Sequence, residues 1–327
     1  MKHNSVLISI IILAVLLTSC TAAATPTAAL TPVKLPLGYV PNVQFAPLYV
    51  AIEKGYFKEE GLDVTLDYNM ETDSVALLGA GKLQFAIVSG EQVLLGRGKG
   101  LPVVYAAAWY NNFPVGVIVD PAKNVTKPAD LKGLNIGLPG TYGANYIGLR
   151  ALLSAGGLKE EDVKLTPVGY TQAESFTSKK VDAASIYATN EPVMLKEKGV
   201  DYSLLKVSDY TTLVANGLAT NEETIKAHPE LVRGMVKAML RGVDDAVKDP
   251  DGAYEICKKF IENFDKADTK VQKAVLAASI EYWKNDKPGS TDPEAWQNMQ
   301  TLLIDMGLLD KELDLSKAYT VEFLPGK

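Results

Sequence analysis

Short apolar segments alternate with helix-like segments along much of the chain, and this alternation restricts the possible folds more than any other feature. Helical patterns lie between several of these segments, as at residues 45–54, 73–80 and 145–155. Strands that alternate with helices favour right-handed βαβ units and mostly parallel sheets. The sequence therefore predicts an α/β fold. Its strands are expected at residues 33–37, 62–66, 85–88, 103–107, 115–119, 135–138, 163–168, 183–187 and 204–207.

The last third of the chain has a different pattern, because short strands give way to long amphipathic helices. These helices are expected at residues 229–248, 254–262, 270–284 and 292–306. A chain of 327 residues is long enough for two lobes that each bury a core. We therefore expect two α/β lobes and a C-terminal helical segment.

The N-terminus, residues 1–19, has the features of an export signal peptide. Lys2 precedes an apolar run at residues 6–17, which is too short for a permanent membrane span. The run ends in Leu-Thr-Ser-Cys, which resembles the lipobox of bacterial lipoproteins and makes Cys20 the predicted lipidation site. An uncleaved anchor, or an ordinary signal peptide with an incidental cysteine, is the alternative.

Residues 20–32 consist almost entirely of Ala, Thr and Pro after the cysteine, a composition that suits an extended tether. A lipid-modified Cys20 at the start of this tether predicts a mature protein anchored in the cell membrane. It would face outward from the cytoplasmic membrane, on the periplasmic side where an outer membrane exists.

Histidine and cysteine are scarce, which argues against several kinds of chemistry. The chain has two of each, and His3 and Cys20 lie in the N-terminal segment. His228 and Cys257 are too few for a zinc site, a disulfide framework or a Ser-His-Asp triad. The 33 basic and 39 acidic residues give a net charge of −6, which does not favour nucleic-acid binding. We therefore expect no catalytic residue, no metal and no cofactor.

Candidate ligand-binding residues follow the expected strands, because ligands of open α/β sheets lie beyond the carboxyl ends of the strands. Aromatic side chains recur there beside Asn, Gln and Glu, whereas Lys and Arg are absent. Aromatic rings stack on flat ligands, and carboxylates accept ring N–H protons, whereas a phosphate or sulfonate calls for Arg or Lys. The set predicts a neutral, planar, nitrogen-rich ligand. Its members are Tyr39, Asn42, Gln44, Phe45, Ser89, Gly90, Glu91, Trp109, Tyr110, Phe113, Thr141, Tyr142, Tyr170, Tyr187, Asn190 and Glu191.

Structural roles are the alternative for parts of this set. Trp109 and its aromatic neighbours could pack the core. Glu91 and Glu191 could be carboxylates that interact favourably with the dipole at the start of a helix. The glycine-rich loop at residues 137–143 could bind an anion at the start of the next helix, or it could be a tight turn.

Several motifs resemble one known family. Residues 38–64, with the sequence GYVPNVQFAPLYVAIEKGYFKEEGLDV, resemble the opening of the substrate-binding proteins of ABC importers that include sulfonate, nitrate and thiamine-pyrimidine binders. Residues 79–86, 127–133 and 190–192 fit the same family in the same order. Two further segments are most similar to its riboflavin-binding branch, residues 88–93 and 187–192.

This resemblance implies a two-lobed periplasmic-binding-protein fold of type II, with the ligand in the cleft between the lobes. One lobe would comprise residues 33–115 and 217–327, including the C-terminal helices. The other lobe would comprise residues 116–216. Each lobe would contain a mostly parallel sheet flanked by helices.

The function that follows is that of an extracytoplasmic solute-binding lipoprotein. It would capture a flat heteroaromatic vitamin, riboflavin being favoured, and deliver it as a monomer to the permease and ATPase subunits of an ABC importer. A thiamine pyrimidine precursor or an alkanesulfonate is the alternative ligand. Another class is a lipoprotein sensor. An enzyme that makes the thiamine pyrimidine from pyridoxal phosphate and its own His is disfavoured, because the predicted cleft has no His.

Overall fold

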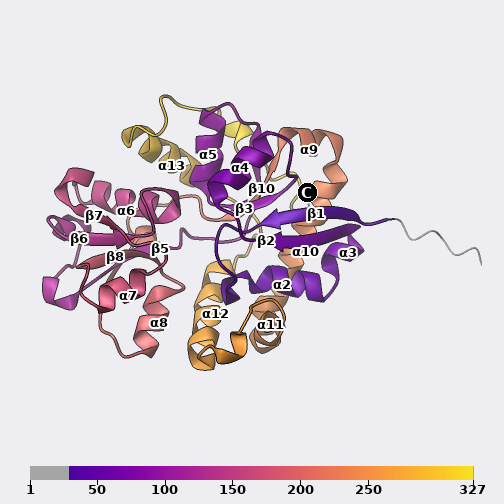
Figure 1. The fold of residues 1–327 in the computed structure, drawn as a ribbon. Helices are drawn as coiled ribbons and strands as arrows, with labels where there is room; N and C mark the ends of the chain where they lie inside the picture. Colours follow the sequence, from indigo (N-terminus) through magenta and orange to yellow (C-terminus); the bar gives the residue numbers. More distant parts are fainter. Residues whose placement is uncertain (1–28, 327) are drawn as a thin grey trace, which may run out of the picture. The chain divides into compact units, whose positions relative to one another are not determined.

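Three sheets organise the part of the chain that the computed structural model describes, residues 29–326 (Figure 1). The first sheet pairs β1 (Thr31–Pro36) with β2 (Leu62–Asp67). The second has the order β3 (Ala86–Val88), β10 (Gly217–Asn221), β4 (Val103–Ala108). The third has the order β7 (Lys164–Pro167), β6 (Asn135–Leu138), β8 (Ala183–Tyr187), β5 (Val115–Val119), β9 (Ser203–Lys206).

One strand in each of the two larger sheets runs against the others. In the second sheet β10 pairs antiparallel with both β3 and β4, so those two share a direction. In the third sheet β5 is antiparallel to β8 and β9, while β6 is parallel to β7 and β8. Most strands of each sheet therefore share one direction, and the predicted α/β class is confirmed.

Helices follow most strands, as the sequence pattern predicts. The first group is α2 (Ala46–Glu53), α3 (Tyr56–Glu59), α4 (Glu71–Gly79), α5 (Gly90–Gly98), α6 (Gly143–Ala155), α7 (Gln172–Thr177) and α8 (Glu191–Glu197). The second group is α9 (Glu222–Ala227), α10 (Pro229–Lys248), α11 (Pro250–Cys257), α12 (Thr269–Trp283) and α13 (Pro293–Asp305). Short 3₁₀ turns include η1 (Val43–Phe45), which connects to α2. None of the described helices is long and apolar enough to cross a bilayer.

Helix α10 illustrates why the C-terminal segment packs back onto the first sheet region. Its buried side chains include Val232, Met235, Val236 and Met239, which recur at intervals of three and four and form one face. This face packs on α2, and the two helices approach so closely that a Cβ at Gly242 would lie 2.1 Å from the Pro47 carbonyl oxygen. Only a residue without a Cβ fits at this position, which explains the glycine.

Three local differences from the sequence prediction have physical explanations. The sequence does not predict strand β10, because only Leu218 and Ala219 of its five buried residues are apolar side chains. Strand β1 includes Thr31 and Pro32, which the composition assigns to the tether; proline is tolerated at the beginning of a strand. Helix α11 is expected at residues 254–262 but extends over Pro250–Cys257. It begins earlier because Pro250 is favoured in the first turn and Asp249 caps the helix.

The expected signal peptide at residues 1–19, Cys20 and the tether as far as residue 28 lie outside the described residues.

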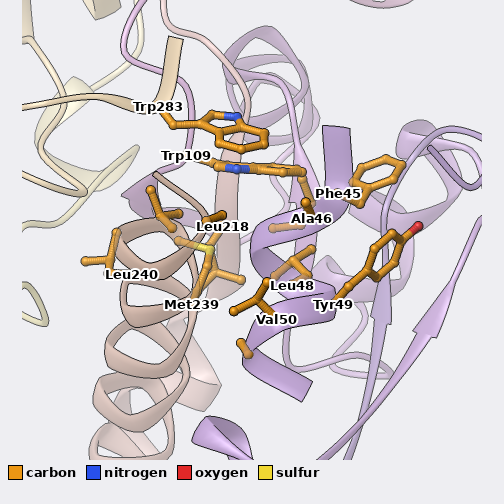
Figure 2. Close-up of a cluster of buried hydrophobic side chains, with 14 of the residues drawn as sticks. Phe45, Ala46, Leu48, Tyr49, Val50, Trp109, Leu218, Met239, Leu240 and Trp283 are labelled. Atoms are coloured by element: carbon orange, nitrogen blue, oxygen red, sulfur yellow. The ribbon is translucent and has the colours of Figure 1, made fainter. Parts of the chain in front are cut away.

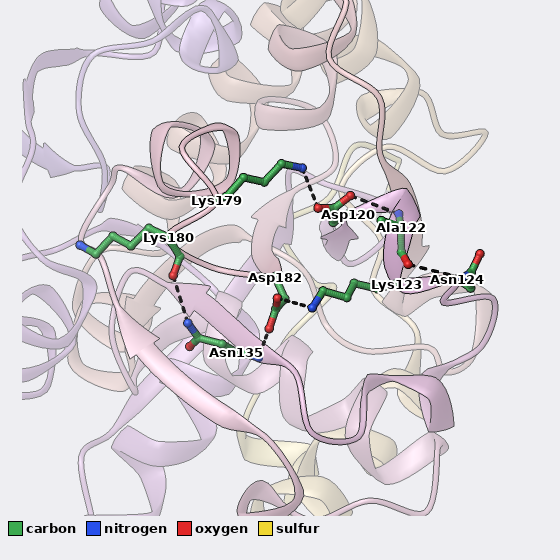
Figure 3. A network of polar contacts seen from close by, with 8 residues as sticks. All are labelled: Asp120, Ala122, Lys123, Asn124, Asn135, Lys179, Lys180 and Asp182. Carbon is green, nitrogen blue, oxygen red and sulfur yellow. Dashed lines mark hydrogen bonds and ion pairs between the residues drawn. The ribbon is translucent and has the colours of Figure 1, made fainter.

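The outer end of the third sheet is charged and exposed. Lys179 pairs with Asp120 at 2.6 Å, and Lys123 pairs with Asp182 at 2.7 Å (Figure 3). The Asp182 carboxylate also accepts the backbone N–H of Asn135. The opposite ends of β6 and β8 carry a very different set of side chains.

Candidate functional site

One cleft lies beyond the carboxyl ends of the strands, where the sequence predicts the ligand site. It encloses about 940 Å³ of space, counting its open mouth. Residues that follow β1, β2, β4, β6, β7 and β8 contribute to it, as do the first residues of α4, α6, α7 and α8. The lining residues are Leu37, Gly38, Tyr39, Gln44, Phe45, Met70, Glu71, Thr72, Ile87, Gln92, Trp109, Tyr110, Pro139, Tyr142, Gly143, Ala144, Asn145, Tyr170, Gln172, Tyr187, Asn190, Glu191 and Asn216.

Most of the predicted ligand-binding residues line this cleft. They are Tyr39, Gln44, Phe45, Trp109, Tyr110, Tyr142, Tyr170, Tyr187, Asn190 and Glu191. No Lys, Arg or His is among the described residues that line it. The sequence predicts that no cationic side chain follows the strands, and the same holds for all described residues of the lining.

The structure does not bring Asn42, Gly90, Phe113 and Thr141 to the cleft surface. The Asn42 side chain caps η1 by accepting the backbone N–H of Gln44 at 3.0 Å. Gly90 lies close against Val214: a Cβ at position 90 would be only 2.4 Å from the Val214 side chain. Phe113 is buried in the core, and Thr141 is exposed outside the lining.

Ser89 and Glu91 also lie behind the cleft surface rather than on it. Both are fully buried at the start of α5. The Ser89 hydroxyl contacts Glu71, which does line the cleft, and Glu91 contacts the same hydroxyl from behind. Glu91 belongs to the first turn of α5, as the helix-dipole alternative anticipated.

Sequence reasoning missed several polar lining residues, of which Glu71, Asn145, Gln172 and Asn216 are the most informative. Glu71 begins the helix after β2, and Gln172 begins the helix after β7. The rule that selects residues beyond strand ends could have found these two. Asn216 lies at the expected lobe boundary, but it precedes β10 instead of following a strand, so the same rule does not select it.

Buried aromatic rings form one side of the cleft. Trp109 lies between Phe45, at 5.5 Å between ring centroids, and Trp283, at 6.3 Å with an angle of 21° between the planes. Figure 2 shows the two indoles stacked above the side chains of α2 and α10. Tyr110 meets Trp109 edge to face at 5.4 Å. Such packing holds the rings in fixed orientations before any ligand binds.

Exposed tyrosines form another part of the lining. Tyr170 meets Tyr39 edge to face at 5.0 Å between centroids. Tyr142 lies across Gly140, where a Cβ would approach its ring to 2.3 Å. Tyr142 and Tyr170 are 48% and 47% exposed, so half of each ring surface remains available to a ligand.

Two separate sets of polar contacts cross the cleft floor. The Tyr187 hydroxyl donates to Asn216 Oδ1 at 3.1 Å, and Asn216 Nδ2 donates to Glu71 Oε1 at 3.3 Å. Gln44 Nε2 donates to Thr189 Oγ1 at 2.6 Å and joins the turn after β1 to the loop after β8. These contacts connect residues of the first two sheets with residues of the third.

Glu191 is a buried acid at the first position of α8. Its Oε2 accepts the backbone N–H of Tyr187 at 3.1 Å. Burial raises the pKa of Glu191 to about 7, and the hydrogen bonds to its carboxylate only partly offset this. The group can therefore accept a ligand N–H when ionised and donate to a ligand carbonyl when protonated.

Three buried polar atoms of the lining have no hydrogen-bond partner among the described residues. They are Trp109 Nε1, Asn145 Oδ1 and Gln172 Oε1. Buried polar groups are normally paired, so one donor and two acceptors remain for a bound molecule. Within residues 29–326 there is no group of three or more His, Cys, Asp or Glu placed to hold a metal ion.

Solved structures show the class to which this fold belongs. The periplasmic aliphatic sulphonate binding protein SsuA of Escherichia coli superposes with a TM-score of 0.71, covering 90% of this chain and 94% of that chain at 14% identity. The chain therefore has the two-lobed fold of periplasmic binding proteins, and the cleft of aromatic and acidic residues lies where such a fold places a ligand.

The sequence comparisons identify the family within this class. Residues 42–253 match the NMT1/THI5-like family. The riboflavin-binding protein RibY of Chloroflexus aurantiacus is 38% identical over 97% of this chain and 96% of its own length. The formylaminopyrimidine-binding protein of Halalkalibacterium halodurans is 32% identical, over 90% and 91% respectively. The chain belongs to the NMT1/THI5-like family, and the resemblance found in its motifs is confirmed.

Enzymes also occur among the relatives. The 4-amino-5-hydroxymethyl-2-methylpyrimidine phosphate synthase THI11 of Saccharomyces cerevisiae is 28% identical over 67% of this chain and 68% of its own length. The family thus includes both binding proteins and synthases.

Proposed function

We propose that this chain is the extracytoplasmic solute-binding protein of an ABC importer, and that its ligand is a flat, neutral, nitrogen-rich ring system. Riboflavin is the favoured ligand. The observation that carries the proposal is a cleft lined by aromatic rings, two acids and several amides, without a single described Lys or Arg. The 38% identity with a riboflavin-binding protein supports the same ligand.

Riboflavin suits the chemistry of this lining. Its fused rings can stack on the aromatic side chains, and its N–H and hydroxyl groups can donate to Glu191 and to the unpaired acceptors Asn145 Oδ1 and Gln172 Oε1. The unpaired Trp109 Nε1 offers a donor for a ring carbonyl.

An aminopyrimidine is the second candidate, because the formylaminopyrimidine-binding relative is 32% identical over most of the chain. Its amino group would donate to Glu71 or Glu191 in the same way. An alkanesulfonate is disfavoured, since its charge would face two acids and, within residues 29–326, no cation of the lining.

The side chains of the cleft argue against the synthase activity of the more distant relatives. A Schiff base needs a Lys, and neither Lys nor His is among the described residues that line the cleft. His228 is exposed before α10, and Cys257 is buried in α11. We therefore propose a binding protein, not an enzyme, with no resident cofactor. An ABC permease and its ATPase would be its partners; a signalling receptor in their place would make it a sensor.

An absorption spectrum of the purified protein tests the ligand assignment. Bound riboflavin would give the yellow flavin spectrum, and protein stripped of ligand by unfolding and refolding should quench riboflavin fluorescence on titration. Absence of both signals, together with tight binding of an aminopyrimidine, would keep the transport role and exclude the flavin.

Binding would proceed by closure of two lobes, which we assign to residues 33–115 with 217–327 and to residues 116–216. A ligand stabilises the closed form by its differential affinity for it. Small-angle scattering with and without saturating riboflavin should show a smaller radius of gyration for the complex. Identical profiles in the presence of proven binding would exclude closure.

Anchoring through Cys20 is the remaining part of the proposal. Two acyl chains on this residue would hold a monomer at the outer face of the membrane, since one chain gives only marginal binding. The full-length protein should partition with membranes, and Cys20→Ser should release or misprocess it. Wild-type protein found wholly in the soluble extracellular fraction with its signal intact would refute the anchor.

A further inference from the structure

Two acids at the cleft floor share one serine hydroxyl. Ser89 Oγ lies 2.6 Å from Glu71 Oε2 and also within hydrogen-bond distance of Glu91 Oε1. Glu71 lines the cleft from the start of α4, and Glu91 lies behind it at the start of α5. The three residues therefore form a row that runs from the ligand space into the core.

The hydrogens of this row can be counted. A serine hydroxyl carries one hydrogen and can donate to only one carboxylate, whereas an ionised carboxylate has none to donate. Two ionised acids would leave one close oxygen–oxygen contact without a hydrogen. One of the two carboxyl groups must therefore carry a proton.

The remaining contacts assign this proton to Glu91. Glu71 accepts three hydrogens, from the Ser89 hydroxyl, from the Ser89 backbone N–H at 3.0 Å and from Asn216 Nδ2. Glu91 is fully buried, its Oε2 has no partner among the described residues, and its only donor besides Ser89 is Gln92 Nε2, at a long 3.4 Å from Oε1. An anion is stabilised by donors, so the well-supplied Glu71 is the carboxylate and Glu91 is the neutral acid.

The surroundings agree with this assignment. The titratable side chains that face the pair are Tyr187 from β8 and Tyr170 after β7, and no described cation compensates the two acids. Burial, followed by the charge of Glu71, raises the pKa of Glu91 to about 8. Burial also raises the pKa of Glu71, and its hydrogen bonds to Ser89 counteract that effect.

We infer that Glu91 is a positioning residue that donates its proton to Ser89, and that Ser89 thereby holds the Glu71 carboxylate at the cleft as the acceptor for an N–H or O–H group of the ligand. This inference rests on the proposed function for the nature of the ligand. It adds a specificity-determining residue, Glu71, and explains how a second acid beside it is tolerated.

The arrangement makes affinity depend on pH in a defined direction. Closure over a ligand removes water from Glu71 and so penalises a second negative charge beside it. Binding therefore favours the form in which Glu91 keeps its proton. As pH rises past about 8, affinity should fall by up to about tenfold per pH unit for this single proton.

The first experiment needs no ligand. In a Glu191→Gln background, which removes the other buried acid with a raised pKa, infrared spectra of the ligand-free protein at pH 7 should contain the carbonyl band of a protonated carboxylic acid, and adding Glu91→Gln should remove it. An unchanged band in the double variant would overturn the assignment of the proton. This measurement is independent of whether riboflavin is the ligand, so it separates failure of this inference from failure of the proposed function.

The second experiment titrates riboflavin between pH 6 and pH 9. Glu91→Gln supplies an amide N–H to Ser89 in place of the acid proton, so its affinity for riboflavin should not decline above pH 8. Glu71→Gln should weaken binding at least tenfold at every pH. The same alkaline decline in Glu91→Gln, or wild-type affinity in Glu71→Gln, would overturn the inference.

Calorimetry in buffers of different ionisation enthalpy gives a further readout. The wild type should take up protons when it binds riboflavin near pH 8, and Glu91→Gln should take up none. Equal proton uptake by both proteins would again contradict the role of Glu91. Far-ultraviolet circular dichroism of each variant checks that it folds.

Discussion

The two sides of the cleft differ in how firmly their aromatic rings are held. Phe45, Trp109 and Tyr110 are each about 95% buried and pack into the same core as α2, α10 and α12. Tyr142 and Tyr170 are about half exposed. We refer to the first three residues as the packed wall and to the two tyrosines as the open wall.

This difference separates two contributions to binding. The side chains of the packed wall are already desolvated and ordered, so they form a preformed surface. Binding on that side therefore costs little side-chain entropy. The open wall keeps apolar ring surface in water, and a ligand that covers it gains the burial of that surface. Stability should therefore reside in the packed wall, and the open wall should affect binding alone.

The largest expected effect is on the packed wall. Trp109→Ala would remove the ring between Phe45 and Trp283 and leave a cavity in the core. We expect a loss of about 3–5 kcal/mol in the free energy of unfolding, measured with denaturant, together with weaker riboflavin binding. Tyr142→Ala is the matched control and should change stability by no more than about 0.5 kcal/mol. Equal losses in both variants would remove the distinction between the walls.

The next effect concerns Glu191, a buried acid of the cleft lining. The pKa of Glu191 is raised to about 7 in the folded protein, so from about pH 4.5 to 7 the folded state binds a proton that the unfolded state has lost. Its contribution to stability must therefore decrease as pH rises through this window, by up to about 1.4 kcal/mol per pH unit. Relative to Glu191→Gln, the wild type should lose stability from pH 5 to pH 7.

Denaturant unfolding at several pH values provides the measurement. Glu262→Gln, at an exposed position, is the control and should follow the wild-type pH profile. A Glu191→Gln profile parallel to that of the wild type would show that Glu191 is not the group responsible.

The smallest effect belongs to the open wall. Tyr170→Ala or Tyr142→Ala should weaken riboflavin binding by about tenfold, because a stacked ring pair adds about 0.5–1.5 kcal/mol beyond the area it buries. Tyr170→Phe keeps the ring and should bind almost as tightly as the wild type. Unchanged affinity in both alanine variants would mean that the ligand contacts the packed wall only.

The sequence predicted the architecture well because its signals are local. The helix 229–248 was expected with the bounds that α10 has, since its apolar positions recur at helical spacing and Pro229 marks its start. Strand β10 escaped prediction because its burial comes from neighbours that are far away in sequence, β3 and β4.

The candidate site was predicted only in part, for a related reason. Residues after a strand could be identified from the sequence, and Tyr39, Trp109 and Glu191 were found in this way. Whether such a residue faces the cleft or the core depends on packing, so Phe113 and Glu91 could not be told apart from true lining residues. Asn216 was missed because it precedes a strand, β10, instead of following one.

The central claim is that this cleft selects an uncharged ring system. Calorimetric titration of the ligand-free protein with riboflavin, a formylaminopyrimidine and an alkanesulfonate, at low and high salt, tests it most directly. We predict that riboflavin binds most tightly and that its affinity changes little with salt, because no ion pair contributes to it. Tight binding of the sulfonate that weakens as salt is added would contradict the account.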